Sequence, residues 1–168
     1  MNAITLRLAR ASDLADVHRI YMHEAVIDYL GYDPMSLAEF VPVFEEMVAS
    51  QAFHIAVKRE GEVEVLLGFC RLIRNTGRAA HRAYLGTFAI DPKHSGQGHG
   101  QAVIRSLAAM LQTQGVRRLE LMMEADNARA ERFYQRLGFV QEGRLREAYK
   151  RGHQAHYVDE VLFVLNLA

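Results

Sequence analysis

The alternation of apolar and polar residues along the chain predicts a series of strands and helices. Residues 4–9 (ITLRLA) alternate with the two-residue period of a half-buried strand. A helix is expected over residues 13–26, with Ser12 as its N-cap, because apolar side chains recur there at helical spacing. These side chains are Leu14, Val17, Ile20 and Tyr21. A second helix is expected over roughly residues 37–49.

The rest of the chain continues this series. Two β-rich runs within residues 52–73 join around Glu60 and Gly61, which predicts a hairpin. The later elements are a strand at 83–91, a helix from the glycine-rich stretch to about Gln114, a strand at 117–123, a short helix at 127–138, and a final antiparallel pair within 139–152 and 156–165. Strand–helix alternation flanked by hairpins implies a mixed α/β sheet with helices on its faces.

Composition narrows the class of protein. The length of 168 residues suits a single domain over 1–168, and the apolar half of the residues is enough for a real core. The 20 basic and 20 acidic residues balance, which gives no long-range attraction to nucleic acid or an anionic membrane. The first residues lack the pattern of a secretory signal, and no apolar run is long enough to span a bilayer. With Cys70 as its one cysteine, the chain is expected to be cytoplasmic, without a nucleic-acid or membrane partner.

A glycine-rich stretch, SGQGHGQ at residues 95–101, lies between an expected strand and an expected helix. It lacks the Lys-Ser or Lys-Thr of a nucleotide phosphate loop, and Gln101 stands where a dinucleotide fingerprint requires glycine. An ordinary turn into a helix is one interpretation. The other is an anion site, because bare N–H groups at a helix N-terminus approach phosphate oxygens and the helix dipole favours negative charge.

Two segments resemble a known family. FAIDPKHSGQGHGQAVIRSL resembles the acetyl-CoA loop of the GCN5-related N-acetyltransferase (GNAT) family, [R/Q]-x-x-G-x-[G/A], with Gly98 and Gly100 in place. Ser95 departs from this motif, in which Arg or Gln is usual. RLELMMEADNARAERFYQRLGF resembles the second signature, N-x-x-A-x-x-x-Y-x-x-x-G-F. Its matching residues are Asn127, Ala130, Tyr134, Gly138 and Phe139.

The resemblance covers nearly the whole chain and implies a fold and an activity. The implied GNAT fold is an α/β (α+β) arrangement, a central mixed and mostly antiparallel sheet with splayed fourth and fifth strands and helices on both faces. The implied reaction moves an acetyl group from acetyl-CoA directly to a primary amine, without a metal. The amine would belong to a small molecule, such as an amino acid or a polyamine, or to a peptide N-terminus. A homodimer is implied by the resemblance alone, and a non-catalytic acyl-CoA-binding or sensor module is the alternative function.

The resemblance also assigns site residues. Cofactor contacts fall on Phe88, Ala89, Ile90, Ser95, Gly96, Gln97, Gly98, His99, Gly100, Gln101, Asn127 and Tyr134. The main chain of residues 88–90 would bind the pantetheine arm as a further strand. Tyr134 would point at the thioester sulfur and act as general acid, since a phenol of pKa about 10 is protonated at neutral pH. From the residues alone, Asn127 is a helix N-cap and Tyr134 a core aromatic.

The general base is the least specified part of the site. Some relatives carry Glu five residues before the motif Asn, where this chain has Met122. Strand alternation places Glu120 and Glu124 on the same face as Met122, so either carboxylate could act through a water. Surface carboxylates without a catalytic role, and proton loss directly to water, are the alternatives.

Other reactive side chains have weaker signals. Cys70 lies inside an expected strand without an activating His nearby, which favours a buried structural thiol over a nucleophile. The pairs His94 with His99 and His153 with His156 lack the carboxylate or Cys that would complete a metal site. The first two helices with their joining loop, together with the final hairpin, are expected to select the acceptor.

Overall fold

The computed structural model describes residues 4–167, which group into two compact units. Unit 1 comprises the chain up to residue 72 together with residues 87–109, and unit 2 comprises residues 73–86 and the chain from residue 110 onward. The strands form a seven-stranded sheet in the order β1-β2-β3-β4-β5-β7-β6. The single domain expected over residues 1–168 stays a prediction, and its outermost residues lie outside the described range.

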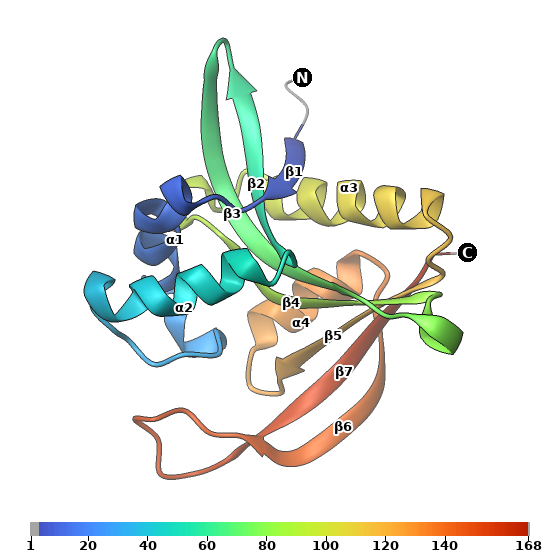
Figure 1. Cartoon of the computed structure of the whole chain (residues 1–168). Coiled ribbons are helices and arrows are strands. Elements are labelled where there is room, and N and C mark those ends of the chain that lie inside the picture. Colours follow the sequence, from blue (N-terminus) through green and yellow to red (C-terminus); the bar gives the residue numbers. More distant parts are fainter. Residues whose placement is uncertain (1–3, 168) are drawn as a thin grey trace. The chain divides into compact units, whose positions relative to one another are not determined.

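Unit 1 is built on an antiparallel hairpin with one added strand (Figure 1). The hairpin strands are β2 (Phe53–Glu60) and β3 (Val63–Arg74), and β1 (Ile4–Leu8) pairs with β2 from Ile4 opposite Lys58 to Leu8 opposite His54. Gly61, with a φ of +63°, lies in the turn, so the hairpin expected around Glu60 and Gly61 is confirmed.

The first helix differs from the expectation at both ends. A 3₁₀ turn (Ala11–Asp13) precedes α1 (Leu14–Tyr21), so Asp13 is the N-cap and the expected cap at Ser12 is wrong. The Asp13 carboxylate makes no cap bond to α1; it stabilises the 3₁₀ turn instead, because it accepts a bond from the Arg10 N–H at 2.7 Å and two bonds from Arg7, both at 2.8 Å. The helix ends at Tyr21 rather than at residue 26, because the chain then turns into a second short 3₁₀ segment (Ile27–Tyr29).

The second helix, α2 (Leu37–Ala49), is confirmed with the expected bounds. Ser36 caps it through a reciprocal pair: the Glu39 N–H donates to Ser36 Oγ at 3.3 Å, and the Ser36 N–H donates to Glu39 Oε2 at 2.8 Å. This capping box satisfies backbone donors that would otherwise lack partners at the helix start.

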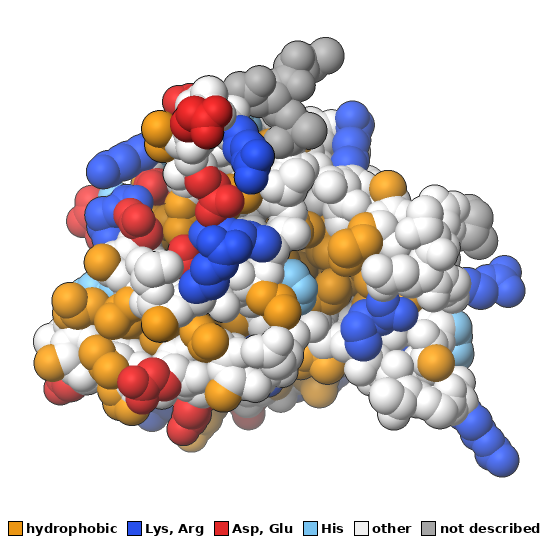
Figure 2. All heavy atoms as spheres, turned by 45° about the horizontal axis from the view of Figure 1, so that its top comes forward, with side chains coloured by type: hydrophobic (Ala, Val, Ile, Leu, Met, Phe, Trp, Pro, Cys, Tyr) orange, Lys and Arg blue, Asp and Glu red, His pale blue; other side chains and the backbone are white. Residues whose placement is uncertain are grey.

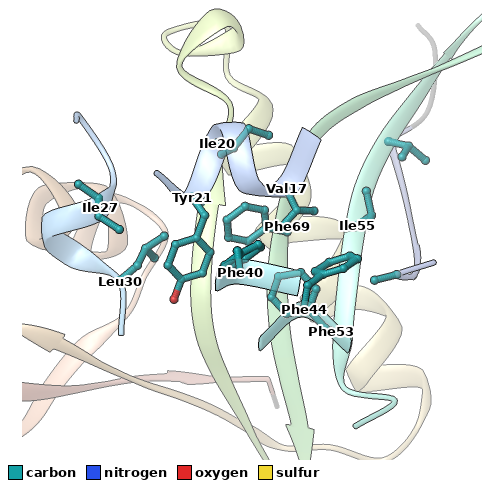
Figure 3. Close-up of a cluster of buried hydrophobic side chains, with 13 residues drawn as sticks. Val17, Ile20, Tyr21, Ile27, Leu30, Phe40, Phe44, Phe53, Ile55 and Phe69 are labelled. Carbon is teal, nitrogen blue, oxygen red and sulfur yellow. The ribbon is translucent and has the colours of Figure 1, made fainter. Parts of the chain in front are cut away.

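Aromatic rings from α1, α2, β2 and β3 point into one cluster and form the core of unit 1 (Figure 3). Tyr21 stacks on Phe69 with ring centroids 5.7 Å apart, and Phe44 meets Phe53 edge-on at 6.3 Å. Each of these side chains is at most 2% exposed. Large buried rings dominate core energetics, so this cluster fixes both helices against the hairpin.

Unit 2 contains antiparallel strands and one short helix (Figure 1). The strands are β5 (Arg118–Glu124), β6 (Val140–Tyr149) and β7 (Val158–Asn166), and the helix is α4 (Ala128–Arg136). β7 pairs with both β5 and β6, and its register with β5 places Glu160 opposite Glu124. The expected final antiparallel pair is therefore confirmed.

β4 (Arg82–Ile90) contributes to both units. Its first residues, 82–84, pair in parallel with residues 118–120 of β5, a three-residue ladder consistent with the expected divergence of the fourth and fifth strands. This is a parallel pair in a sheet whose other described registers are antiparallel, as the expected mixed, mostly antiparallel GNAT fold requires.

The backbone of β3 approaches the end of β4 very closely. A Cβ atom at Gly68 would lie 2.2 Å from the carbonyl oxygen of Ala89 and 2.9 Å from Cα of Ile90, so only glycine fits without a backbone shift. The strand bends just before this contact, where Thr87 adopts a φ of +48° that non-glycine residues rarely occupy. The approach and the bend together set the direction of residues 88–90.

In the described part of the chain, no helix is long and apolar enough to cross a lipid bilayer.

Candidate active site

The glycine loop, residues 95–98, joins a 3₁₀ turn (Pro92–His94) to α3 (His99–Thr113). Gly96 and Gly98 have φ values of +76° and +79°, which L-residues with side chains rarely adopt. The Ala102 N–H donates to the Gly98 carbonyl at 3.1 Å as the helix begins, and the N–H groups of the first turn have no partner within the helix. The loop residues are exposed, so this geometry is compatible with the anion site that the sequence predicts, which stays a prediction.

Asp91 anchors the entry to this loop. Its side chain is 3% exposed, accepts the Lys93 N–H at 2.9 Å and pairs with Arg19 Nη2 of α1 at 2.7 Å. Burial alone would raise the pKa of this carboxyl, but the hydrogen bonds from Arg19 and the Lys93 N–H outweigh it and lower the pKa. Asp91 therefore stays ionised and ties the loop to α1. The sequence pattern above did not single out Asp91, although an Asp before Pro is a recognisable capping signal.

Imidazoles and an ammonium group surround the start of α3. The rings of His94 and His99 meet edge-on with centroids 6.0 Å apart. Burial, followed by the positive charges of Lys58 and His94, lowers the pKa of His99. Its buried Nε2 atom has no hydrogen-bond partner among the described residues. The lowered pKa favours the neutral imidazole of His99, so His99 can contribute to an anion site through a ring N–H rather than through charge.

The strand end expected to bind the pantetheine arm, residues 88–90, directly follows the bend at Thr87. Ala89 is 6% exposed, and Phe88 and Ile90 are half-buried. The Asp91 N–H donates to the Leu67 carbonyl at 2.8 Å, which fixes the point where this segment leaves β4. The segment and the glycine loop are thus consecutive, and both belong to unit 1.

The second signature lies in unit 2. Asn127 is the N-cap of α4, because its Oδ1 accepts the Ala130 N–H at 3.0 Å. Tyr134 is 7% exposed, and its ring packs edge-on against Phe139 with centroids 5.2 Å apart. The structure therefore confirms that Asn127 is a helix N-cap and that Tyr134 is a core aromatic, as the sequence pattern predicts. The helix ends before Gly138, whose φ of +90° suits a glycine.

Glu120 is surrounded by arginines on β4 and β5. Arg82 binds its two carboxylate oxygens at 2.9 and 2.7 Å, and Arg118 donates to Oε1 as well. The Arg82 guanidinium, opposed by burial and assisted by Arg118, lowers the pKa of Glu120. A carboxylate held ionised by two cations is a weak proton acceptor, so these contacts favour a structural role for Glu120.

Glu124, four residues further along β5, has the opposite environment. It is 7% exposed, and among the described residues no Lys or Arg forms an ion pair with it. Burial raises the pKa of this carboxyl; its own N–H and the charge of Arg151 oppose the rise, and the charges of Glu160 and Asp126 add to it. A buried carboxyl with a raised pKa binds a proton more readily than an ordinary carboxylate, which makes Glu124 the better proton acceptor of the two.

An arginine that the sequence analysis missed lies beside this carboxyl. Arg151, in the loop between β6 and β7, is 5% exposed and binds both carboxylate oxygens of Asp126 at 2.7 and 2.9 Å. Asp126 belongs to the turn between β5 and α4. No local pattern could reveal this pair, because its residues are 25 positions apart.

The thiol of Cys70 is buried in β3, and burial raises its pKa to about 12. Such a thiol is protonated at neutral pH and is not an activated nucleophile. The interpretation of Cys70 as a buried structural residue is therefore confirmed.

Acidic and basic side chains lie interspersed around the tip of the β2–β3 hairpin on the face shown in Figure 2. One pair there is Lys58 with Glu60, at 2.6 Å. This mixture leaves the surroundings of the hairpin tip without a charge of one sign.

Comparison with known proteins identifies relatives. The model of the acetyltransferase (GNAT) family matches residues 14–139. A spermidine N(1)-acetyltransferase of Vibrio cholerae is 25% identical over 148 residues, which are 87% of this chain and 84% of that protein. N-alpha-acetyltransferase 30 of Schizosaccharomyces pombe is 32% identical over 74 residues, 44% of this chain and 49% of that protein. The crystal structure of a Vibrio cholerae spermidine N-acetyltransferase in complex with CoA and spermine has the same fold, with a TM-score of 0.78 at 22% identity over 98% of this chain and 95% of that chain.

Replacement of Glu120 or Glu124 of β5 by the uncharged Gln should change the stability of the folded protein in opposite directions. Because the pKa of Glu124 is raised in the folded protein, its ionisation destabilises the fold as pH rises, so Glu124→Gln should raise the melting temperature at pH 8. A gain of about 1 kcal/mol corresponds to about 2–4 °C in a chain of this size. Glu120→Gln is the matched control, and it should lower the melting temperature at pH 8 because Arg82 loses its carboxylate partner and Arg118 keeps only Glu142. Thermal unfolding by circular dichroism measures both, and a loss of stability in Glu124→Gln would contradict the prediction.

Proposed function

We propose which acceptor this chain uses. The chain belongs to the GNAT acetyltransferase family and is therefore an N-acetyltransferase that uses acetyl-CoA. In this proposal the acetyl group moves directly to a primary amine of a small molecule, of the amino acid or polyamine kind, or of a peptide N-terminus. The observation that carries the proposal is the glycine loop, whose two positive-φ glycines lie at the N-terminus of the fifteen-residue helix α3. Two relatives support this choice of amine: one is named a spermidine N(1)-acetyltransferase, and the other is named an N-alpha-acetyltransferase.

The cofactor is held mainly by main-chain groups in this proposal. The N–H groups of residues 95–101 receive the pyrophosphate of CoA, and the positive end of the α3 dipole favours its charge. Ser95, which replaces the usual Arg or Gln, contributes a short hydroxyl and its backbone. The backbone of residues 88–90 pairs with the pantetheine arm, and an N–H of this segment, at Ala89 or Ile90, stabilises the oxyanion of the tetrahedral intermediate.

The chemical step needs a neutral amine and a proton for the leaving group. A C–N bond forms as the amine nitrogen attacks the acetyl carbonyl carbon, and the C–S bond breaks as the intermediate collapses; the nitrogen then loses its extra proton to solvent, from which the deprotonated acid regains its own. We assign to Tyr134 the proton that the CoA thiolate receives, because a phenol is protonated at neutral pH. The packing of its ring against Phe139 orients the side chain.

Glu124 is our candidate for the group that takes the proton from the bound ammonium. Met122 stands where some relatives carry Glu, and its side chain cannot accept a proton. Arg82 and Arg118 hold Glu120 in its ionised form, which makes it a weak base. Glu124 is buried, has a raised pKa and lies two residues beyond Met122 on the same face of β5. A water between this carboxyl and the ammonium would carry the proton.

A panel of amines tests the proposal directly. The purified chain is incubated with acetyl-CoA and, in separate reactions, polyamines, amino acids and short peptides, and free CoA thiol is measured over time. We expect at least one amine to accelerate thiol release at least about tenfold over buffer alone. Tight acetyl-CoA binding without acceleration by any amine would instead support a binding or sensor module.

The glycine loop predicts a specific loss of cofactor binding. At Gly98, with a φ of +79°, a β-branched side chain is strained by about 1–2 kcal/mol and obstructs the approach of phosphate. Gly98→Val should therefore weaken acetyl-CoA binding at least about tenfold in calorimetry. Gly61→Val is the matched control, because it places the same residue at a φ of +63° in the hairpin turn. Equal binding by the two variants would remove the glycine loop from the proposal.

The role of Tyr134 predicts a loss in turnover rather than in binding. Tyr134→Phe keeps the ring contacts and removes the hydroxyl, so kcat should fall about 100-fold while the Kd of acetyl-CoA changes little. Tyr84→Phe is the control, since Tyr84 lies in the paired part of β4, opposite Glu120. A Tyr134→Phe variant that turns over at the rate of the unmodified chain would exclude this tyrosine as the acid.

A further inference from the structure

The loop between β6 and β7, residues 150–157, is attached to the β5–α4 turn by an ion pair between the buried Arg151 and Asp126, whose side chain is 48% exposed. Arg151 donates from Nη1 and Nη2 to the two carboxylate oxygens of Asp126, at 2.7 and 2.9 Å. The guanidinium also donates to Gln154 Oε1 at 3.3 Å and lies 5.9 Å from the centre of the Tyr149 ring. A planar guanidinium with two parallel bonds to a carboxylate has a defined orientation, so this pair fixes the loop in register with the turn.

The turn that Arg151 holds carries residues of the proposed site. Asp126 lies between Glu124, the proposed base, and Asn127, the N-cap of the helix that carries Tyr134. The Ala125 N–H donates to the Asp159 carbonyl at 2.8 Å, which ties the same turn to the start of β7. A displacement of Asp126 would therefore move the base and the helix start together.

The charges around Glu124 come from three parts of unit 2. Arg151 attracts its carboxylate from the β6–β7 loop, Asp126 repels it from the turn, and Glu160 repels it from the opposite position on β7. His156, in the same loop as Arg151, faces Asp126. The guanidinium of Arg151 keeps its positive charge at every pH of interest here.

We propose that Arg151 is a positioning residue of the acetyl transfer: its bidentate pair with Asp126 holds the β6–β7 loop on the β5–α4 turn and sets the balance of charge at Glu124. This inference rests on the proposed function of Glu124 as the base. Arg151 acts through its neighbours and touches no reacting atom in this account. The pair is neutral as a whole, and removal of either member leaves the other charge uncompensated beside Glu124.

Opposite shifts in the pH profile test this proposal. With one amine from the panel, kcat/KM is measured between about pH 5 and pH 9 for Arg151→Gln and for Asp126→Asn. Arg151→Gln leaves the negative charge of Asp126, so the acid limb of the profile should move to higher pH. Asp126→Asn leaves the positive charge of Arg151, so the limb should move to lower pH. We expect the rates of the two variants to differ by at least about threefold on that limb, beyond any change common to both.

A purely structural role would lower activity in both variants without moving the limb in opposite directions, and that result would overturn the proposal. Arg144→Gln is the matched control, because it removes an arginine from another Arg–Asp pair of unit 2, the pair with Asp159 at 2.6 Å that joins β6 to β7. Its profile should keep the midpoint of the unmodified chain. If Arg151→Gln fails to fold, the Asp126→Asn shift decides, and an unmoved midpoint there also overturns the proposal.

A titration independent of activity separates this inference from the role of the base. The Glu124 carboxyl is followed by NMR in protein labelled with ¹³C-glutamate, and its signal is assigned by its loss in Glu124→Gln. Full activity of Glu124→Gln would refute the assignment of Glu124 as the base. The effect of the ion pair on Glu124 would still be tested by NMR, where its carboxyl signal should titrate at higher pH in Arg151→Gln and at lower pH in Asp126→Asn. An unmoved Glu124 signal in both variants would refute that effect, whatever the activity of Glu124→Gln.

Discussion

The close approach of β3 to the end of β4 sets where the proposed cofactor site begins. At Gly68 no side chain fits between the two backbones, and the Asp91 N–H hydrogen bond to the Leu67 carbonyl holds the strand one step later. Asp91 then pairs with Arg19 of α1, so a backbone contact and a buried ion pair fix the entry to the glycine loop from two directions. A binding site made of main-chain donors depends on such support, because it has few side chains that can adjust to a ligand.

Two carboxylates on the same face of β5 differ in chemical character because their surroundings differ. Glu120 lies at the end of β5 that pairs with β4, where Arg82 and Arg118 hold it ionised. Glu124 lies at the other end, where burial raises the pKa of the carboxyl and no ion pair joins it to another described residue. The same side chain can therefore serve as a structural anion or as a proton acceptor, and its position relative to arginines decides which.

The features that could be predicted from the sequence are those specified locally. The β2–β3 hairpin, the capping box of α2 and the glycine loop before α3 each depend on residues within a few positions of one another. The start of α1 could not be predicted, since it depends on the bonds of Asp13 to Arg7 on the preceding strand. The pairs Arg82–Glu120 and Arg151–Asp126 join residues 38 and 25 positions apart, and charged residues at such distances have many equivalent partners in the sequence. The sequence therefore led to both β5 carboxylates but could not distinguish between them.

Structural and catalytic roles of the second signature are compatible at the level of single atoms. The cap at the start of α4 uses Oδ1 of Asn127, and the side-chain amide N–H groups remain chemically suited to a pantetheine carbonyl. Tyr134 packs through the edges and faces of its ring, whereas the proposed proton transfer uses its hydroxyl. A residue whose packing function fixes its orientation is well placed to hold a reactive atom within the narrow tolerance that acid catalysis requires. The core aromatic and the general acid are therefore complementary descriptions of one side chain, because each concerns a different part of it.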